Sequence, residues 1–288
     1  MKQSERVWTV LSMLEWATKY FQEKMVPDPR LSIEWILAEA LEIKRLDLYL
    51  QFDRPLSSEE LDRIRPLVKR RARHEPLQYI TGSTEFINTR IEVNEHVLIP
   101  RIETEQMVDL LLDHFKERSD EPLSLLDIGT GSGCIPIAIK KEFPEWSCAG
   151  LDISEEALEV ATNNAAINET EVHFFRGNID SLDEWQKERS IKWDIIISNP
   201  PYITHQEKSE LHPQVIEHEP HLALFHDEPL QLYENIVKFA ANLEAKLYLE
   251  CNDKLARRIQ EMGKKYFNSA ALFQDLDDND RFVVCNNS

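Results

Sequence analysis

Apolar residues recur at helical spacing through the first 75 positions of this 288-residue chain. The stripes run through residues 7–14, 33–41 and 61–68, with charged residues between the apolar ones. Apolar positions three or four apart line one face of a helix, and that face needs a core to pack against. The pattern therefore predicts a small helical bundle as an N-terminal domain, residues 1–78.

The pattern changes beyond this bundle. Glycine and asparagine punctuate short alternating runs in residues 79–100, which predicts a β-hairpin that links two domains. In residues 101–288 short apolar segments alternate with helical patterns, an order typical of a mostly parallel sheet with helices on both faces. The fold class is therefore α/β. The predicted strands are residues 123–128, 147–151, 172–175, 193–198, 246–249, 270–274 and 281–285.

Composition is typical of a globular protein. Apolar residues make up 42% of the chain and charged residues 30%, a balance that supports folded cores in about two domains. The sequence has no run of about 18 uncharged apolar residues and no N-terminal secretory signal. Its four cysteines are too scattered for a metal cluster or a disulfide framework, as in proteins of a reducing compartment. We therefore expect a cytoplasmic protein with no metal site and no membrane association.

Charge divides unevenly along the chain. Residues 1–90 hold 15 Lys and Arg against 14 Asp and Glu, whereas residues 91–288 hold 18 against 38. Because a strongly negative surface repels phosphate backbones, direct nucleic-acid binding is not expected. The same charge favours a cationic ligand or a basic protein partner, although an acidic surface also serves solubility alone.

Residues 125–133 read LLDIGTGSG, an apolar strand followed by a glycine-rich turn and then a helix. Gly129, Gly131 and Gly133 are three of the seven glycines in the chain. A ligand that touches backbone requires glycine, because a side chain would stand in its way. The spacing is neither G-x-G-x-x-G nor a Walker loop. A tight turn without a ligand is the alternative.

Asp152 ends the next predicted strand. In a doubly wound sheet this position places a carboxylate at the C-terminal edge, beside the glycine loop, where it can accept both hydroxyls of a ribose. The loop and Asp152 together indicate an adenosine-type ligand. The alternative is that Asp152 caps the helix that begins near Ser154.

Asn199-Pro200-Pro201-Tyr202 directly follows another apolar strand. The prolines end the strand and hold Asn199 extended, since a residue before proline avoids the helical region. They also remove two N–H donors, so the turn presents acceptors, the Asn199 side-chain oxygen and nearby carbonyls, that suit an NH2 group. Tyr202 supplies a flat ring to pack against a planar substrate. A purely structural Pro-Pro turn is the alternative.

The turn 199–202 and the loop 129–133 resemble the two signature motifs of S-adenosylmethionine-dependent methyltransferases that modify planar amino groups. Residues 76–80 (PLQYI), 98–105 (LIPRIETE) and 219–224 (EPHLAL) resemble the HemK/PrmC family more narrowly, and the similarity extends over nearly the whole chain. That family methylates the glutamine side-chain amide in the Gly-Gly-Gln motif of peptide chain release factors. The resemblance implies a Rossmann-like methyltransferase sheet, S-adenosylmethionine as cofactor, release factors as partners, and an N-terminal domain that docks the substrate.

The resemblance also implies roles for single residues. The cofactor would be held by Gly129, Thr130, Gly131, Ser132, Gly133, Asp152, Ile179 and Asn199. The substrate glutamine would be held by Asn199, Pro200, Pro201 and Tyr202, with Asn199, Pro200 and Tyr202 as catalytic residues. Three departures from the family pattern are Asn178 in place of Asp, Ile102 in place of Pro, and residues 225–229 (FHDEP) in place of a glycine-rich turn.

The implied mechanism relies on positioning. The Asn199 side-chain oxygen and the Pro200 carbonyl would accept the two amide hydrogens and aim the nitrogen at the donor methyl group, without a side-chain base. Holding such a near-attack geometry contributes roughly 7–11 kcal/mol.

Two other functions stay open. An adenine-N6 nucleic-acid methyltransferase would act on the same kind of planar amine, and a binding module without catalysis would explain the altered loop 225–229. The spacing of the nearby histidines fits no helix-borne metal site, so we interpret them as loop surface. They are His205, His212, His218 and His226.

Overall fold

The computed structural model describes residues 7–189 and 191–287. The chain divides into two compact units. Unit 1 comprises Met1–Gly82 and His212–His218, and unit 2 comprises Ser83–Leu211 and Glu219–Ser288. Among the described residues, no helix combines the length and apolar character needed to cross a membrane.

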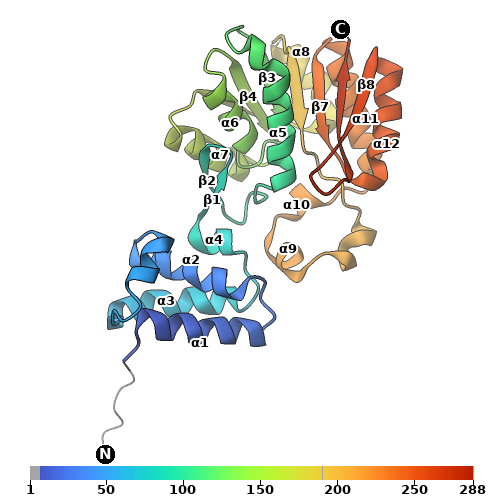
Figure 1. Cartoon of the computed structure of the whole chain (residues 1–288). Coiled ribbons are helices and arrows are strands. Elements are labelled where there is room, and N and C mark those ends of the chain that lie inside the picture. The colour runs from blue at the N-terminus through green and yellow to red at the C-terminus, as the bar shows by residue number, and fades with distance from the viewer. Residues whose placement is uncertain (1–6, 190, 288) are drawn as a thin grey trace, which may run out of the picture. The chain divides into compact units, whose positions relative to one another are not determined.

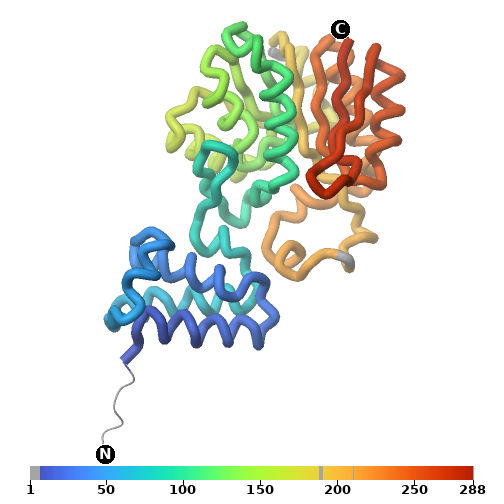
Figure 2. The backbone as a smooth tube through the Cα atoms, in the orientation of Figure 1, coloured from blue at the N-terminus to red at the C-terminus, as the bar shows by residue number. Residues whose placement is uncertain are grey.

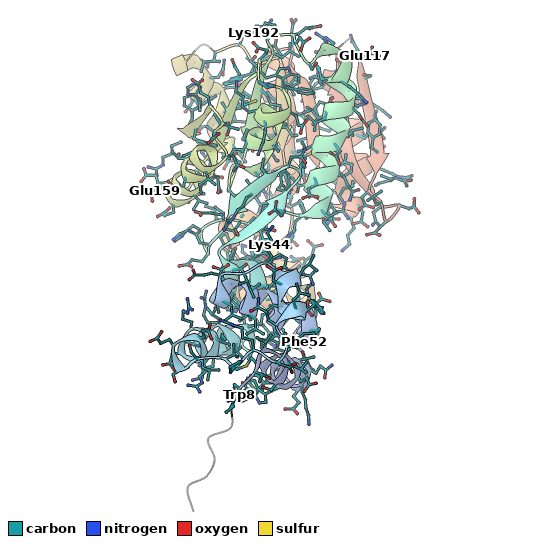
Figure 3. The ribbon with its side chains drawn as sticks, turned by 60° about the vertical axis from the view of Figure 1, so that its left-hand side comes forward. Trp8, Lys44, Phe52, Glu117, Glu159 and Lys192 are labelled. Carbon is teal, nitrogen blue, oxygen red and sulfur yellow. The ribbon has the colours of Figure 1, made fainter. Side chains whose placement is uncertain are left out.

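Unit 1 is the predicted helical bundle. Its elements are α1 (Val10–Glu23), α2 (Pro29–Leu41), the 3-10 helix η1 (Arg45–Leu50), α3 (Ser58–Arg71) and α4 (Leu77–Thr81) (Figure 1). Their apolar faces meet in a core that includes Leu14, Ile33 and Ile64. Trp8 and Phe52, labelled in Figure 3, pack at the border of this core.

A segment from far along the chain completes unit 1. It contains α9 (Pro213–His218) and follows the Asn-Pro-Pro-Tyr turn in the sequence. Arg71, only 3% exposed, donates to Ser32 Oγ at 3.0 Å, to two backbone carbonyls, and to Gln214 Oε1 at 2.8 Å. His218 Nε2 lies 3.3 Å from a carbonyl oxygen just after α3. Arg71 therefore ties α9 to the bundle through a buried network.

Unit 2 begins with a hairpin of β1 (Ser83–Phe86) and β2 (Thr89–Glu92), which pair antiparallel. The run Val97 to Ile99, expected as part of this hairpin, is not a strand. Its backbone is irregular because the Ile99 N–H donates to the Glu219 carboxylate, at 3.3 Å, instead of to a neighbouring strand. Glu219 also forms a buried ion pair with Arg101 at 2.7 Å.

The rest of unit 2 is built on a seven-stranded sheet with the order β5-β4-β3-β6-β7-β9-β8. All seven predicted strands are present, with ends that differ by at most two residues. Five neighbouring strands, β5, β4, β3, β6 and β7, pair in parallel. β9, at the red end of the tube in Figure 2, pairs antiparallel with both β7 and β8. The strands are β3 (Ser124–Ile128), β4 (Ser147–Asp152), β5 (Val172–Arg176), β6 (Ile195–Ser198), β7 (Lys246–Glu250), β8 (Ser269–Gln274) and β9 (Asp280–Asn286).

Helices cover both faces of this sheet (Figure 1). The central strands are buried on both sides, which explains why they are apolar without alternation, as in Ile195, Ile196 and Ile197. One face carries α5 (Ile102–Phe115), α6 (Cys134–Glu142) and α7 (Glu155–Ile167), and the other α8 (Leu182–Arg189), α11 (Pro229–Asn242) and α12 (Asp253–Tyr266). The shorter helices of unit 2 are η2 (Lys116–Arg118), η3 (Ile179–Ser181), η4 (His205–Glu210) and α10 (His221–Leu224).

Candidate active site

A cavity of about 350 Å³ opens at the carboxyl edge of the sheet. Gly129 and Gly131 follow β3, Asp152 ends β4, Ile179 follows β5 and Asn199 follows β6, and all five line the cavity. The strand order reverses between β3 and β6, and ligands of open α/β sheets bind at such a switch point. The volume lies within the usual range of small-molecule sites.

The glycine loop leaves room for a ligand at two of its three glycines. Gly129 and Gly131 have φ values of +78° and +52°, and a Cβ atom at either would meet no atom within 4 Å. Each would project into open space beside the cavity. At Gly133 a Cβ would lie 3.0 Å from Ala161 Cβ, so this glycine permits close packing of α6 on α7. Thr130, Ser132 and Gly133 do not line the cavity, and the first two are buried behind the loop.

Asp152 joins the glycine loop to the start of α7. Its Oδ2 accepts from the Gly131 N–H at 2.8 Å, and its Oδ1 accepts from the Ser154 N–H at 3.0 Å. The helix cap is Ser154, whose hydroxyl accepts from the Ala157 N–H at 3.1 Å. Burial raises the pKa of Asp152 above its ordinary value, although the backbone donors oppose this. Since a carboxylate has about four acceptor positions, Asp152 keeps capacity for ligand hydroxyls.

The Asn-Pro-Pro-Tyr turn distributes its side chains over different surroundings. Asn199 and Pro201 line the cavity, whereas Pro200 is buried and lines neither this cavity nor the second one beside it. Tyr202 faces a second, more open cavity of about 790 Å³ and packs against the core of the sheet. The structure thus brings Asn199 and Pro201 to the glycine loop and Asp152, but it places the Tyr202 ring elsewhere.

The amide of Asn199 is held by a residue that the sequence analysis did not single out. Its Nδ2 donates to Thr104 Oγ1 at 3.1 Å, and Thr104 Oγ1 donates to Glu250 Oε2 at 2.7 Å. Glu250 ends an apolar strand at the carboxyl edge, as Asp152 does, and that position was the available signal. Thr104 lies within the LIPRIETE segment, but nothing in its spacing indicates a partner in the distant turn.

Two further segments of the cavity wall were also missed. One is residues 95–98, which follow the hairpin. The other is the altered loop, where Phe225 and His226 line the cavity. His226 is a partly exposed loop residue, as expected, but its place on the cavity wall was not predicted. This loop runs beside Ile203, whose N–H donates to the Leu224 carbonyl at 3.2 Å and whose carbonyl accepts from the His226 N–H at 3.0 Å. Backbone pairing therefore fixes it without the family's glycines.

The charge of the cavity suits a cation. Three carboxylates line it, those of Glu95, Asp152 and Asp180, and the lining includes no lysine or arginine among the described residues. Asp127, fully buried beneath the glycine loop, adds a fourth carboxyl group, and burial raises its pKa to about 7. Open space over two glycines, a hydroxyl-binding carboxylate and an acidic lining together fit the sulfonium nucleoside S-adenosylmethionine.

The sheet order with its reversed last strand, and the glycine loop beside Asn199, define a Rossmann-like S-adenosylmethionine-dependent methyltransferase. Solved structures of that class share the fold. The N-terminal domain of human METTL16 in complex with SAH has a TM-score of 0.50 at 16% identity, over 70% of this chain and 77% of that one. The T. thermophilus 16S rRNA N2 G1207 methyltransferase RsmC, in complex with AdoMet and guanosine, has a TM-score of 0.52 at 11% identity, over 72% and 50%.

Sequence comparison identifies the family. Residues 12–82 match the PrmC N-terminal domain, and residues 102–225 match the methyltransferase small domain. The release factor glutamine methyltransferase of Flavobacterium psychrophilum is 38% identical over 92% of this chain and 93% of its own length. That of Leptospira interrogans is 37% identical over 96% and 97%. The chain belongs to the release factor glutamine methyltransferase family.

Proposed function

We propose that this protein transfers a methyl group from S-adenosylmethionine to the side-chain amide nitrogen of the glutamine in the Gly-Gly-Gln motif of peptide chain release factors. The observation that carries the proposal is the environment of Asn199. Its NH2 group is bound to Thr104, so its carbonyl oxygen is the group left to accept a hydrogen from a substrate. Asn199 lines the same cavity as Gly131 and Asp152.

The cofactor residues divide into two groups. Gly129, Gly131, Asp152, Ile179 and Asn199 line the cavity and would contact the cofactor. Thr130, Ser132 and Gly133 would support the loop from behind. When bound, S-adenosylmethionine supplies a methyl group on a positively charged sulfur, which the acidic lining favours.

The chain's own contribution is orientation. An amide nitrogen is a poor nucleophile because its lone pair is delocalised into the carbonyl group. In this proposal Asn199 Oδ1 accepts one amide hydrogen, and the Pro200 carbonyl, next to Asn199 and Pro201 on the cavity wall, would accept the other. These bonds would hold the nitrogen in place and return electron density to it. The prolines keep the acceptors rigid. No side-chain base is required before transfer, and such positioning contributes roughly 7–11 kcal/mol. Tyr202 would border the substrate from the second cavity.

The remaining assignments follow from this activity. Residues 1–78 would dock the release factor, residues 79–100 would link the two domains, and residues 101–288 would form the catalytic domain. A cytoplasmic location is supported by four free, buried cysteines. Direct nucleic-acid binding is not part of the proposal, because the net charge of residues 91–288 is strongly negative.

The experiment is mass spectrometry of a release factor after incubation with the enzyme and labelled cofactor. We expect one added methyl group on the glutamine of the Gly-Gly-Gln motif. Asn199→Ala should lower turnover at least ~100-fold, because a transition-state contact is lost. The affinity for S-adenosylhomocysteine should stay near wild type, because the four other cavity-lining residues still hold the cofactor. Asn168→Ala, outside the cavity, is the control. Labelled nucleic acid with an unlabelled release factor would contradict the proposal.

A further inference from the structure

Asn199, Thr104 and Glu250 form a hydrogen-bonded chain that runs from the cavity into the core of unit 2. The Asn199 Nδ2 to Thr104 Oγ1 distance is 3.1 Å, and the Thr104 Oγ1 to Glu250 Oε2 distance is 2.7 Å. Thr104, in the first turn of α5, is 4% exposed, and Glu250, the last residue of β7, is 1% exposed. Because β6 and β7 pair in parallel, with Ser198 opposite Leu249, the turn after β6 lies beside the end of β7.

The chemistry of the three groups fixes the direction of hydrogen donation, from Asn199 to Thr104 and from Thr104 to Glu250. A carboxylate only accepts hydrogen bonds, and a threonine hydroxyl has a single hydrogen to donate. Thr104 therefore gives its hydrogen to Glu250 and can only accept from Asn199. Asn199 consequently turns its NH2 group inward and leaves Oδ1 for the cavity side, where no side chain or backbone group of the described residues donates to it.

We propose that Thr104 and Glu250 are positioning residues that set the hydrogen-bond polarity of the substrate site, so that it accepts an NH2 group and discriminates against a carboxylate. This inference rests on the proposed function, because it explains how the site selects glutamine over glutamate. Without the carboxylate, the Thr104 hydroxyl is able to donate to Asn199 Oδ1. The Asn199 side-chain amide would then flip and present its two N–H donors to the N–H donors of the substrate amide. Buried polar groups would be left mispaired.

The protonation state of Glu250 controls the direction. Burial raises the pKa of Glu250 to about 7, while the bond from Thr104 and the charges of Arg281 and Arg101 lower it and Glu103 raises it. Below this pKa the protonated carboxyl group can itself donate to Thr104, and the direction is lost. Tyr202, Tyr233 and Cys251 also face Glu250, and burial raises the pKa of each, so they stay neutral through this range.

The test uses variants of the full chain, assayed with a release factor. Thr104→Val removes the hydroxyl at nearly equal size, Thr104→Ser retains it, and Glu250→Gln replaces an acceptor with an amide that can also donate. We expect kcat to fall roughly 10–100-fold in Thr104→Val and in Glu250→Gln. Thr104→Ser should stay near wild type, and affinity for S-adenosylhomocysteine should stay unchanged throughout. The double variant should lose no more than either single one, because both break the same chain.

Two readouts separate this role from a packing role. Wild-type kcat should rise with pH to a plateau above about 7, the pKa of Glu250, and the Glu250→Gln profile should lack that step. Carboxyl ¹³C NMR of the wild type should show the Glu250 carboxyl group titrating near 7, and this signal should be absent in Glu250→Gln. In Thr104→Val the pKa of Glu250 should rise, because a hydrogen bond to its charged form is lost. Thr162→Val, on the surface of α7, is the matched control and should change neither the pH profile of kcat nor the carboxyl titration.

The outcomes are distinct. Wild-type kcat in both Thr104→Val and Glu250→Gln overturns the inference and leaves the methyltransferase activity in place. Equal losses in Thr104→Ser and Thr104→Val also overturn it, because only packing would then matter. If Glu250→Gln does not fold, the two Thr104 variants decide. If the wild-type enzyme does not methylate a release factor, the proposed function fails, and the NMR titration alone still decides whether Thr104 binds a titrating Glu250.

Discussion

Gly131 borders the cofactor cavity, so we predict that one added methyl group at this position weakens cofactor binding while the protein still folds. Gly131 has a φ of +52°, and a Cβ atom there meets no protein atom within 4 Å. In Gly131→Ala the added methyl group therefore causes no clash within the folded chain. It occupies space that the cofactor needs.

The loss of folding stability and the loss of cofactor affinity can be estimated separately. An L-residue in the left-handed region costs roughly 1–2 kcal/mol, and 1 kcal/mol shifts the Tm of a domain of this size by about 2–4 °C. We therefore expect Gly131→Ala to melt about 2–8 °C below wild type. An extra methyl group in a well-packed site costs about 1–3 kcal/mol, which corresponds to an affinity loss of roughly 5- to 150-fold.

The assay is calorimetric titration of S-adenosylhomocysteine into each purified protein, together with thermal unfolding without ligand. Gly82→Ala is the matched control, because Gly82 has a φ of +75°, a Cβ there also meets open space, and the residue does not line the cavity. Gly82→Ala should show a similar backbone cost and unchanged affinity. Wild-type affinity in Gly131→Ala would refute the placement of the cofactor over the glycine loop.

Three further predictions concern the support of the site. Asn164, fully buried, accepts from the Glu92 N–H at 2.7 Å and donates to the Glu92 carbonyl and to a carbonyl of the glycine loop. Asn164→Ala should lower the free energy of unfolding by about 1–3 kcal/mol for each buried group left unpaired, and a urea denaturation curve that matches wild type would contradict this. Arg101→Ala leaves the Glu219 carboxylate, 0% exposed, without its partner, and should cost about 3–5 kcal/mol. Adding Glu219→Gln should restore part of the loss, and the failure of that rescue in the same denaturation assay would argue against a buried-charge effect. The pKa of Asp127 is raised from 3.8 to about 7 by burial, so the stability that its neutral form contributes is complete below about pH 4 and lost as the pH rises through 7. Asp127→Asn should therefore gain in Tm relative to wild type between pH 5 and pH 8, and a constant difference would contradict the buried charge.

The strands and the main motifs could be predicted because local chemistry decides them. A run such as Ile195 to Ile197, buried on both faces, has few alternatives to a central strand. Two prolines after Asn199 end that strand whatever surrounds it. The carboxyl ends of parallel strands then meet at one edge, so Asp152 and Asn199 could be placed together from the sequence.

The other parts of the site depend on contacts that leave no local signal. Thr104 and Glu250 are 146 positions apart and meet only through the sheet. The irregular segments that complete the cavity wall have no periodicity, so the pairing of Ile203 with the 224–226 backbone was not predictable. The association of α9 with the helical bundle involves the buried Arg71, and nothing in the sequence distinguishes this arginine from exposed neighbours such as Arg73.

That association makes unit 1 discontinuous in sequence, and the discontinuity limits how the protein can be divided. Cleavage after Gly82 would not release two complete modules, since residues 212–218 would stay behind on the larger fragment without the arginine that binds them. The shortened enzyme would keep its sheet and its cofactor cavity, yet the stretch following the Asn-Pro-Pro-Tyr turn would lose its anchor. Loss of activity on truncation would therefore reflect the freed segment 212–218 as well as the loss of the helical bundle.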